Sequence, residues 1–330
     1  MGASKMLTSK SSAGILASFL CLHLAAAAAD LSTTPVRLPV VNLGLTNFQD
    51  GLAAPGWMFE ELPETYIAGQ MKDPNGKTVP GANHTSVYST TTHIAFISKK
   101  RVFGGWLLGE AVLPLADVEV QFAGGAPTID RGFGDLTVGA GVQWKPRKVR
   151  TSGVFAHRFV ADFSVPTGTY SDLRPVNIGN HFIYANPNYT FTYQPNGKAE
   201  FSSRIHYLWN ATNHDPFVGL GFANMQAGQA VHANFTASYE VLKDVRLGLN
   251  GYWLQQFTDD KIDGVAISPS RERTIGLGPG VQFSGRGIWF RVNSYIETDV
   301  RNRPSGIAVT LRVTKVLGSG EDSSSSKRIP

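Results

Sequence analysis

Apolar and polar residues alternate with a period of two along most of this chain. In residues 245–257, the odd-numbered positions are mostly apolar and include Trp253 and Phe257, whereas the even-numbered positions are mostly polar and include Arg246. Such a period places successive side chains on opposite faces of a β-strand. The same pattern recurs in residues 134–145, 199–210, 231–241, 288–297 and 307–314. The chain is therefore predicted to be all-β, with strands that separate an apolar face from a polar one.

The predicted strands are unusually long. Most contain about 11–14 residues, roughly twice the usual length in soluble proteins, whereas a tilted strand needs about 9–11 residues to cross a bilayer. Beyond residue 30, no run of about 18 apolar residues indicates a membrane helix. Strands with one apolar and one polar face average to a neutral hydropathy, as in a transmembrane β-barrel. We therefore predict that the apolar rows face lipid.

The connections between the predicted strands alternate in length. Short connections are expected at residues 99–102, 146–152, 194–198, 242–244 and 285–287. Longer connections are expected at 70–85, 123–132, 166–180, 211–228 and 259–271, with 300–304 as a short exception. Transmembrane barrels have short periplasmic turns and longer outer loops. Counted from an irregular first strand at 56–69, the sequence predicts an antiparallel transmembrane barrel of about 12 strands with both chain ends on the periplasmic side.

The first residues have the layout of a secretory signal peptide. Lys5 and Lys10 precede an apolar stretch that ends in three alanines just before Asp30, and small residues in that place favour cleavage. The only cysteine, Cys21, lies in the part expected to be removed, so neither a disulfide nor a thiol nucleophile is predicted. The predicted division of the chain is a signal peptide at 1–29, an N-terminal periplasmic or plug segment at 30–55, a β-barrel at 56–317 and a hydrophilic tail at 318–330.

Composition narrows the classes of partner and cofactor. Charged residues make up 17% of the 330 residues and the net charge is +5, but no basic stripe accompanies that charge. No nucleic-acid partner is therefore expected. The eight histidines include no HExxH motif, and the glycine-rich stretches 132–141 and 276–280 are not followed by the helix that a phosphate loop requires. The sequence predicts no metal and no cofactor.

The polar rows are predicted to line a lumen. They place arginines on five different strands, and a closed interior requires such charges to pair or to contact water. Aromatic side chains in the same rows offer flat surfaces on which a small aromatic compound could stack while its hydroxyl meets an arginine or Gln256. Alternatively, these side chains only fill and brace a barrel of intermediate width. The candidate substrate-path residues are Arg158, Arg204, Arg246, Tyr252, Gln256, Trp289, Arg291, Tyr295 and Arg312.

Two other function classes are considered. In an outer-membrane enzyme acting on lipid, the inward residues Ser202, Ser238, His206 and His232 could assemble a hydrolytic site. Serine and histidine are also common in any polar lumen, so the sequence predicts no enzyme. The remaining class is a secreted β-rich protein that binds a ligand without spanning a membrane.

Six stretches in a fixed order resemble a known family. They read "NLGLTNFQDGLAAPGWMF", "VPTGTY", "FSSRIHYLWN", "NGYWLQQFTDD", "GLGPGVQF" and "DVRNRPSGIAVTLRVTKV". Over residues 42–317, this set resembles the family of the meta-pathway of phenol degradation. The resemblance implies an outer-membrane barrel of a Gram-negative cell that acts as a channel or transporter for passive uptake of small hydrophobic or aromatic compounds. Its partners would be that small-molecule substrate and outer-membrane lipid, while the oligomeric state stays open.

Overall fold

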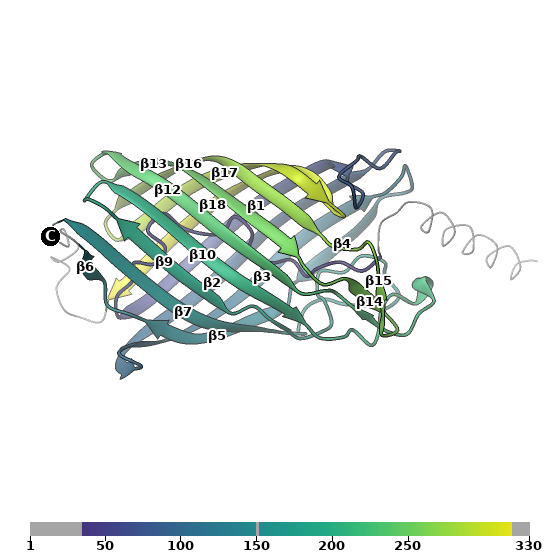
Figure 1. The fold of residues 1–330 in the computed structure, drawn as a ribbon, viewed down its shortest axis with the longest axis horizontal. Coiled ribbons are helices and arrows are strands. Elements are labelled where there is room, and N and C mark those ends of the chain that lie inside the picture. Colours follow the sequence, from purple (N-terminus) through teal and green to yellow (C-terminus); the bar gives the residue numbers. More distant parts are fainter. Residues whose placement is uncertain (1–34, 150–151, 319–330) are drawn as a thin grey trace, which may run out of the picture.

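The computed structural model describes residues 35–149 and 152–318, and their strands close into one barrel (Figure 1). The predicted signal peptide 1–29 and residues 319–330 of the predicted tail lie outside the described residues. β1 (Gly56–Met71) pairs with β2 (His84–Val102) on one side and with β18 (Pro304–Gly318) on the other, which closes the sheet. The wall has 12 antiparallel strands, which confirms the predicted fold class and strand number.

Two of the wall strands are interrupted where proline removes a backbone donor. β4 (Thr128–Phe133) and β5 (Leu136–Gln143) form one wall strand, and its break lies opposite Pro114 of β3 (Gly105–Gln121). Pro187 separates β8 (Tyr184–Ala185) from β9 (Asn188–Gln194). Because proline has no N–H, the ladder lacks one donor at each place, although both proline carbonyls still accept a backbone hydrogen bond. The remaining wall strands are β7 (Gly153–Val165), β10 (Ala199–Asn210), β12 (Ala230–Leu242), β13 (Val245–Gln256), β16 (Arg273–Gly285) and β17 (Ile288–Arg301).

The two ends of the barrel differ in their connections. At one end, Phe103–Gly104 and Arg286–Gly287 are two-residue turns in which both residues have positive φ, as type I′ hairpins require. The predicted connection 99–102 is therefore misplaced, because those residues still belong to β2. We call this the short-turn end, and the opposite end the long-loop end. The links at the long-loop end are 72–83, 122–127, 166–183, 211–229, 257–272 and the short 302–303.

Short strands and a 3-10 turn lie at the two ends of the barrel wall. β6 (Arg147–Val149) pairs with β7 at the short-turn end. At the long-loop end, β11 (Met225–Gln226), β14 (Asp260–Ile262) and β15 (Val265–Ile267) form a three-stranded sheet, and η1 (Val218–Leu220) is a single 3-10 turn. No helix of the described chain is long and apolar enough to span a membrane.

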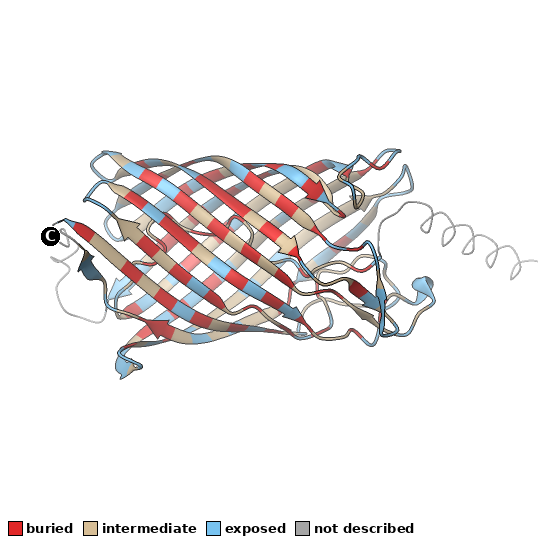
Figure 2. Cartoon of the chain, viewed as in Figure 1, coloured by how far each residue is buried: buried red, intermediate tan, exposed pale blue. Residues whose placement is uncertain are grey.

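Burial alternates along the wall strands as the sequence pattern predicts (Figure 2). In β13, Leu249 is 68% exposed on the outer face, whereas Arg246 and Asn250 are buried on the inner face. An apolar outer surface and a polar interior are typical of a barrel that is solvated by lipid. The assignment of the two faces is thereby confirmed.

The least regular predicted strand also forms. β1 extends over 16 residues, with adjacent glutamates on opposite faces. Glu60 points inward, where His93 Nδ1 lies 2.8 Å from its carboxylate. Glu61 points outward and accepts hydrogen bonds from the hydroxyl groups of Thr90 and Thr92. Both departures from apolar alternation are therefore compensated by local polar partners.

Cysteine labelling tests which end faces the cell exterior. In a Cys21→Ser background, Val265→Cys at the long-loop end is expected to react with an impermeant thiol reagent on intact cells, because Val265 is 70% exposed. Gly197→Cys in a short turn is expected to react only after the outer membrane is disrupted. A Cβ at Gly197 meets no atom within 4 Å, so this variant should fold normally. Labelling in the reverse pattern would overturn the orientation.

Candidate functional site

The lumen holds a stretch of the chain itself. Residues 35–55, here called the luminal segment, run through the barrel from the long-loop end to the short-turn end (Figure 1). Near the segment's start, Arg37 Nη1 donates to the carbonyl of Asn302 at 3.1 Å. Near its end, Ala53 packs on the apolar cluster of Ile97 and Leu108. The two ends of the barrel wall, Gly56 and Gly318, pair at the short-turn end, as an even number of strands predicts. The luminal segment, in contrast, starts at the long-loop end.

Two of the candidate arginines bind Asp50 of the luminal segment. Arg204 donates from Nη2 to Oδ1 at 2.8 Å and from Nε to Oδ2 at 3.0 Å. Arg158 Nη2 lies 3.0 Å from Oδ1, and its Nη1 donates to the Asp50 carbonyl. Both ion pairs are almost completely buried, so the Asp50 carboxylate compensates two buried cations.

Two further candidate arginines hold the backbone of the same segment. Arg312 Nη2 donates to the Leu45 carbonyl, and its Nη1 lies 3.3 Å from Oε1 of Glu60. Arg291 donates to the carbonyl of Phe48 at 3.3 Å, and its guanidinium carbon lies 4.7 Å from the centre of the Phe48 ring. A cation over an aromatic face adds to the hydrogen bonds. Four of the five candidate arginines therefore bind the luminal segment.

The fifth candidate arginine, Arg246, has a different role. Its Nη1 donates to the Lys198 carbonyl at 3.0 Å and to the Ser238 hydroxyl at 3.1 Å. Glu240 lies 3.6 Å from its Nη2. These partners join β12 and β13 to the neighbouring turn, so Arg246 braces the short-turn end.

Two candidate tyrosines also contact the luminal segment. The rings of Tyr252 and Tyr295 have centres 5.1 Å apart. Tyr295 donates its hydroxyl to the Gly44 carbonyl at 2.6 Å, while Tyr252 donates to Glu297 at 3.1 Å. Gly44 has φ of +76°, and a Cβ there would lie 2.9 Å from the Tyr295 ring. Only glycine fits this conformation and this close approach.

The last two candidates lie apart from this cluster. Trp289 is half-buried at the start of β17, in register with Thr314 near the short-turn end. Gln256 donates to Oδ1 of Asp260 at 2.7 Å and belongs to the long-loop end. The structure therefore brings together the arginines and tyrosines of mid-lumen, but it does not include Trp289 or Gln256 in one aromatic site.

The residues considered for hydrolysis do not form serine–histidine pairs in the described structure. Ser202 and Ser238 donate to the two oxygens of Glu200 at 2.6 and 2.9 Å. His206 and His232 stack on each other with ring centres 4.2 Å apart. Within residues 35–149 and 152–318, no group of three His, Cys, Asp or Glu side chains is placed to hold a metal ion.

Asp260 lies where the long loops meet the end of the lumen. Its Oδ1 accepts hydrogen bonds from the Gly228 backbone at 2.9 Å and from Gln256 at 2.7 Å. Its buried Oδ2 has no hydrogen-bond partner among the described residues. Burial raises the pKa of Asp260 to about 7, although the hydrogen bond from Gly228 opposes this shift.

The raised pKa of Asp260 predicts a pH dependence of the long-loop end. The folded loops bind the proton more tightly than the unfolded chain, so their stability is greatest at low pH and falls as the pH rises from about 3.8 to about 7. Proteolysis of the loops in the native chain should therefore accelerate over this range. Asp260→Asn, whose amide replaces the protonated oxygen, is expected to flatten the profile. Identical profiles for both chains would contradict this assignment.

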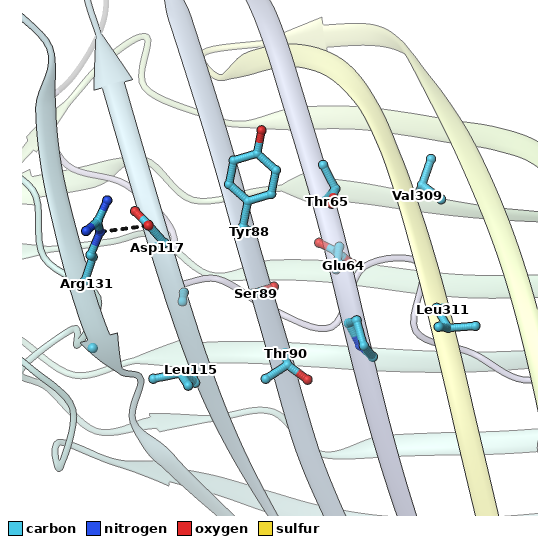
Figure 3. A pocket seen from close by; sticks show the side chains of 13 residues that line it. Glu64, Thr65, Tyr88, Ser89, Thr90, Leu115, Asp117, Arg131, Val309 and Leu311 are labelled. Atoms are coloured by element: carbon cyan, nitrogen blue, oxygen red, sulfur yellow. Dashed lines mark ion pairs between the residues drawn. The ribbon is translucent and has the colours of Figure 1, made fainter.

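The outer wall carries a hollow of about 640 Å³ across β18, β1, β2, β3 and β4 (Figure 3). The ion pair between Arg131 and Asp117, 2.8 Å long, borders it on β3 and β4. The outward side chains that line it are mostly apolar: Pro63, Thr65, Tyr88, Leu115, Val309 and Leu311. Such a lining suits an apolar molecule that reaches the wall from the bilayer.

Sequence reasoning missed the part played by Asp50. One signal was available, because Asp50 is the only charged residue between Arg37 and Glu60. A single acid in an otherwise uncharged stretch, facing a barrel with five inward arginines, would have indicated that this stretch enters the lumen. The pattern of alternation carries no such information, because the segment has no regular secondary structure.

The chain is similar to known outer-membrane proteins. The model of a family described as "Putative MetA-pathway of phenol degradation" matches residues 68–313. No curated protein matches the sequence.

Among solved structures, an outer membrane channel from Pseudomonas putida F1 has a TM-score of 0.70 at 16% identity, covering 81% of this chain and 97% of that one. This likeness shows the fold. The monoaromatic hydrocarbon channel CymD has a TM-score of 0.41 at 7% identity, over 82% of this chain and 91% of its own. A FadL homologue from Pseudomonas aeruginosa has a TM-score of 0.38 at 10% identity, over 80% and 91%.

Proposed function

The chain belongs to the phenol-degradation family whose model matches it, and from this premise we propose that it is an outer-membrane channel of a Gram-negative cell. In this proposal, it passes small hydrophobic or aromatic compounds by passive diffusion. Passage requires no covalent step, so the proposed function is not enzymatic. The partners are the small-molecule substrate and the lipid around the outer wall.

One observation carries the proposal: a separable peptide fills the lumen. Small barrels can be filled by the side chains of their own walls, and such an interior cannot open without unfolding. Here the luminal segment occupies the space between inward side chains, and within the described chain it continues covalently only into β1. We propose that residues 30–55 act as a plug, and that displacement of the segment opens the conduit.

The groups around the luminal segment suit aromatic compounds with a polar substituent. When the segment leaves, Arg291 loses the Phe48 ring and Tyr295 loses the Gly44 carbonyl. The freed guanidinium and hydroxyl groups can bind a phenolic oxygen, while the rings of Tyr252 and Tyr295 offer flat contacts. The hollow in the outer wall offers a second apolar surface to the same class of compound.

Uptake by cells tests the proposed function. Lipopolysaccharide slows the entry of hydrophobic molecules, so cells without channels of their own provide a low background. Production of this chain is expected to raise the initial uptake of radiolabelled phenol and toluene at micromolar concentration, with little effect on a disaccharide. The same cells with an empty expression vector serve as the control. Equal uptake by both strains would contradict the proposal.

A further inference from the structure

The surroundings of Asp50 have the form of a binding site for a free carboxylate. Arg158 of β7 and Arg204 of β10 are both in register with Thr190 of β9, so they project into the lumen from one row across three strands. Arg204 presents Nε and Nη2 to the two carboxylate oxygens at 3.0 and 2.8 Å. A planar fork of this kind matches carboxylate geometry. Asp50 is thus bound as an external carboxylate would be.

Asp50 is the acid in direct contact with these two arginines, whereas Glu110 interacts with both only at longer range. Among the described residues, Asp50 is the only carboxylate that forms an ion pair with Arg158 or Arg204. Each arginine side chain is only 11% exposed. If Asp50 left, two buried cations would lose the carboxylate that contacts both of them, which is unfavourable. The vacated place would therefore attract an anion.

The luminal segment also places an aromatic ring in the lumen. Phe48 precedes Asp50 by two residues, and its ring lies against the guanidinium of Arg291. The segment therefore presents to the lumen the two groups of an aromatic acid, a ring and a carboxylate. A solute with both groups could replace both contacts.

We propose that Arg158 and Arg204 form a binding site for small aromatic carboxylates, with Asp50 as its built-in ligand. Such a solute releases the luminal segment by replacing Asp50. The site holds one carboxylate before and after the exchange, so its net charge does not change. A neutral aromatic compound lacks the group that replaces Asp50, so it passes when the segment undocks on its own and does not accelerate that undocking. This proposal rests on the proposed function only for the entry of solutes into the lumen.

Thiol labelling of the purified full chain in detergent tests the release directly. Thr46 is 2% exposed and its hydroxyl has no hydrogen-bond partner among the described residues. Thr46→Cys in a Cys21→Ser background therefore reports undocking with little disturbance. At constant ionic strength, benzoate is expected to accelerate maleimide labelling several-fold and saturably, whereas benzamide and chloride leave the rate unchanged. Equal rates with benzoate and benzamide would overturn the proposal.

Substitutions in the site give a second readout. Arg204→Lys keeps the charge but removes the fork, so about tenfold more benzoate should be needed for the same acceleration. Arg174→Lys alters another arginine–aspartate pair, between a long loop and Asp130 of β4, and is the matched control. A benzoate requirement that is unchanged by Arg204→Lys, or raised equally by Arg174→Lys, would contradict the site.

Removing the built-in ligand should strengthen benzoate binding. In calorimetry, Asp50→Asn is expected to bind benzoate at least about tenfold more tightly than the native chain, because the site is no longer occupied. Heat-modifiable gel migration shows whether Asp50→Asn folds into a barrel. If it does not, Asp50→Glu, which keeps the charge, is used in its place. It should bind benzoate more tightly than the native chain, since its longer side chain fits the site less well. Native affinity in the folded variant would overturn the proposal.

The two proposals fail in different ways. If benzoate does not accelerate labelling but phenol uptake still depends on this chain, the carboxylate site is wrong and the channel stands. If benzoate accelerates labelling but phenol uptake is independent of the chain, the site stands and the proposed substrate class is wrong.

Discussion

Deletion of residues 35–54 is expected to convert the closed barrel into an open conduit for ions. The luminal segment contacts inward side chains of several wall strands, including Thr192 of β9, Asn234 of β12 and Arg312 of β18. Its removal leaves a lumen of intermediate width whose freed arginines contact water. Conductance in planar bilayers should rise at least about tenfold over the native chain, since a 12-stranded wall encloses more space than the filled eight-stranded barrels.

The control for this deletion lies in the same segment. Val40 is 90% exposed, so Val40→Ser should change neither folding nor conductance. Heat-modifiable gel migration verifies that the shortened chain has folded. A folded deletion variant that conducts no better than the native chain would show that the lumen is closed by something other than the luminal segment.

Leu249→Arg is expected to cost about 2–4 kcal/mol of folding free energy in lipid, because it places a charge on the outer face near the middle of the bilayer. The same change at Leu242, at the short-turn end of β12, should cost only about 0–1 kcal/mol. Leu249 and Leu242 are both 68% exposed, so depth is the main difference between the two sites. Unfolding in lipid vesicles by urea measures both values. Equal costs would mean that the outer face does not meet a bilayer.

Asn250 follows Leu249 and faces the lumen, and an added charge at this position would disturb the packing. Asn250 is 1% exposed and donates to the Ser294 carbonyl at 3.1 Å. A Cβ at Gly280 would lie 2.4 Å from its Oδ1 and 3.1 Å from the Phe48 ring. An arginine at position 250 would therefore press on the luminal segment. The inner face is polar, as the sequence predicts, but it is also packed.

The wall of the barrel could be predicted from the sequence because its signal is local. A period of two assigns each side chain to a face, and Leu249 and Arg246 follow it. The alternation of short and long connections also holds, and even the irregular β1 forms where it was expected. The positions of the turns were less accurate, because the hairpin at Phe103–Gly104 depends on φ values rather than on polarity.

The partners of the candidate residues could not be predicted in the same way. Asp50 is separated by 108 residues from Arg158 and by 154 from Arg204. Such contacts arise only when the barrel closes around a segment that has no pattern of its own. For the same reason, the sequence grouped Trp289 with Tyr252 and Tyr295, although Trp289 lies near the short-turn end.

The central claim is that passage requires the luminal segment to move, and a reversible cross-link tests it most directly. Leu43 packs against the cluster of Tyr252, Tyr295 and Ala308. Leu43→Cys with Ala308→Cys, in a Cys21→Ser background, therefore places two thiols in one cluster, where a short reducible bis-thiol reagent can join them. The two single variants are the controls.

Initial phenol uptake by cells is measured with the cross-link intact and after its reduction. The account predicts that the cross-linked double variant takes up phenol at the rate of cells without the channel, that reduction restores uptake, and that neither single variant responds to reductant. Rapid uptake through the cross-linked chain, unchanged by reduction, would contradict it.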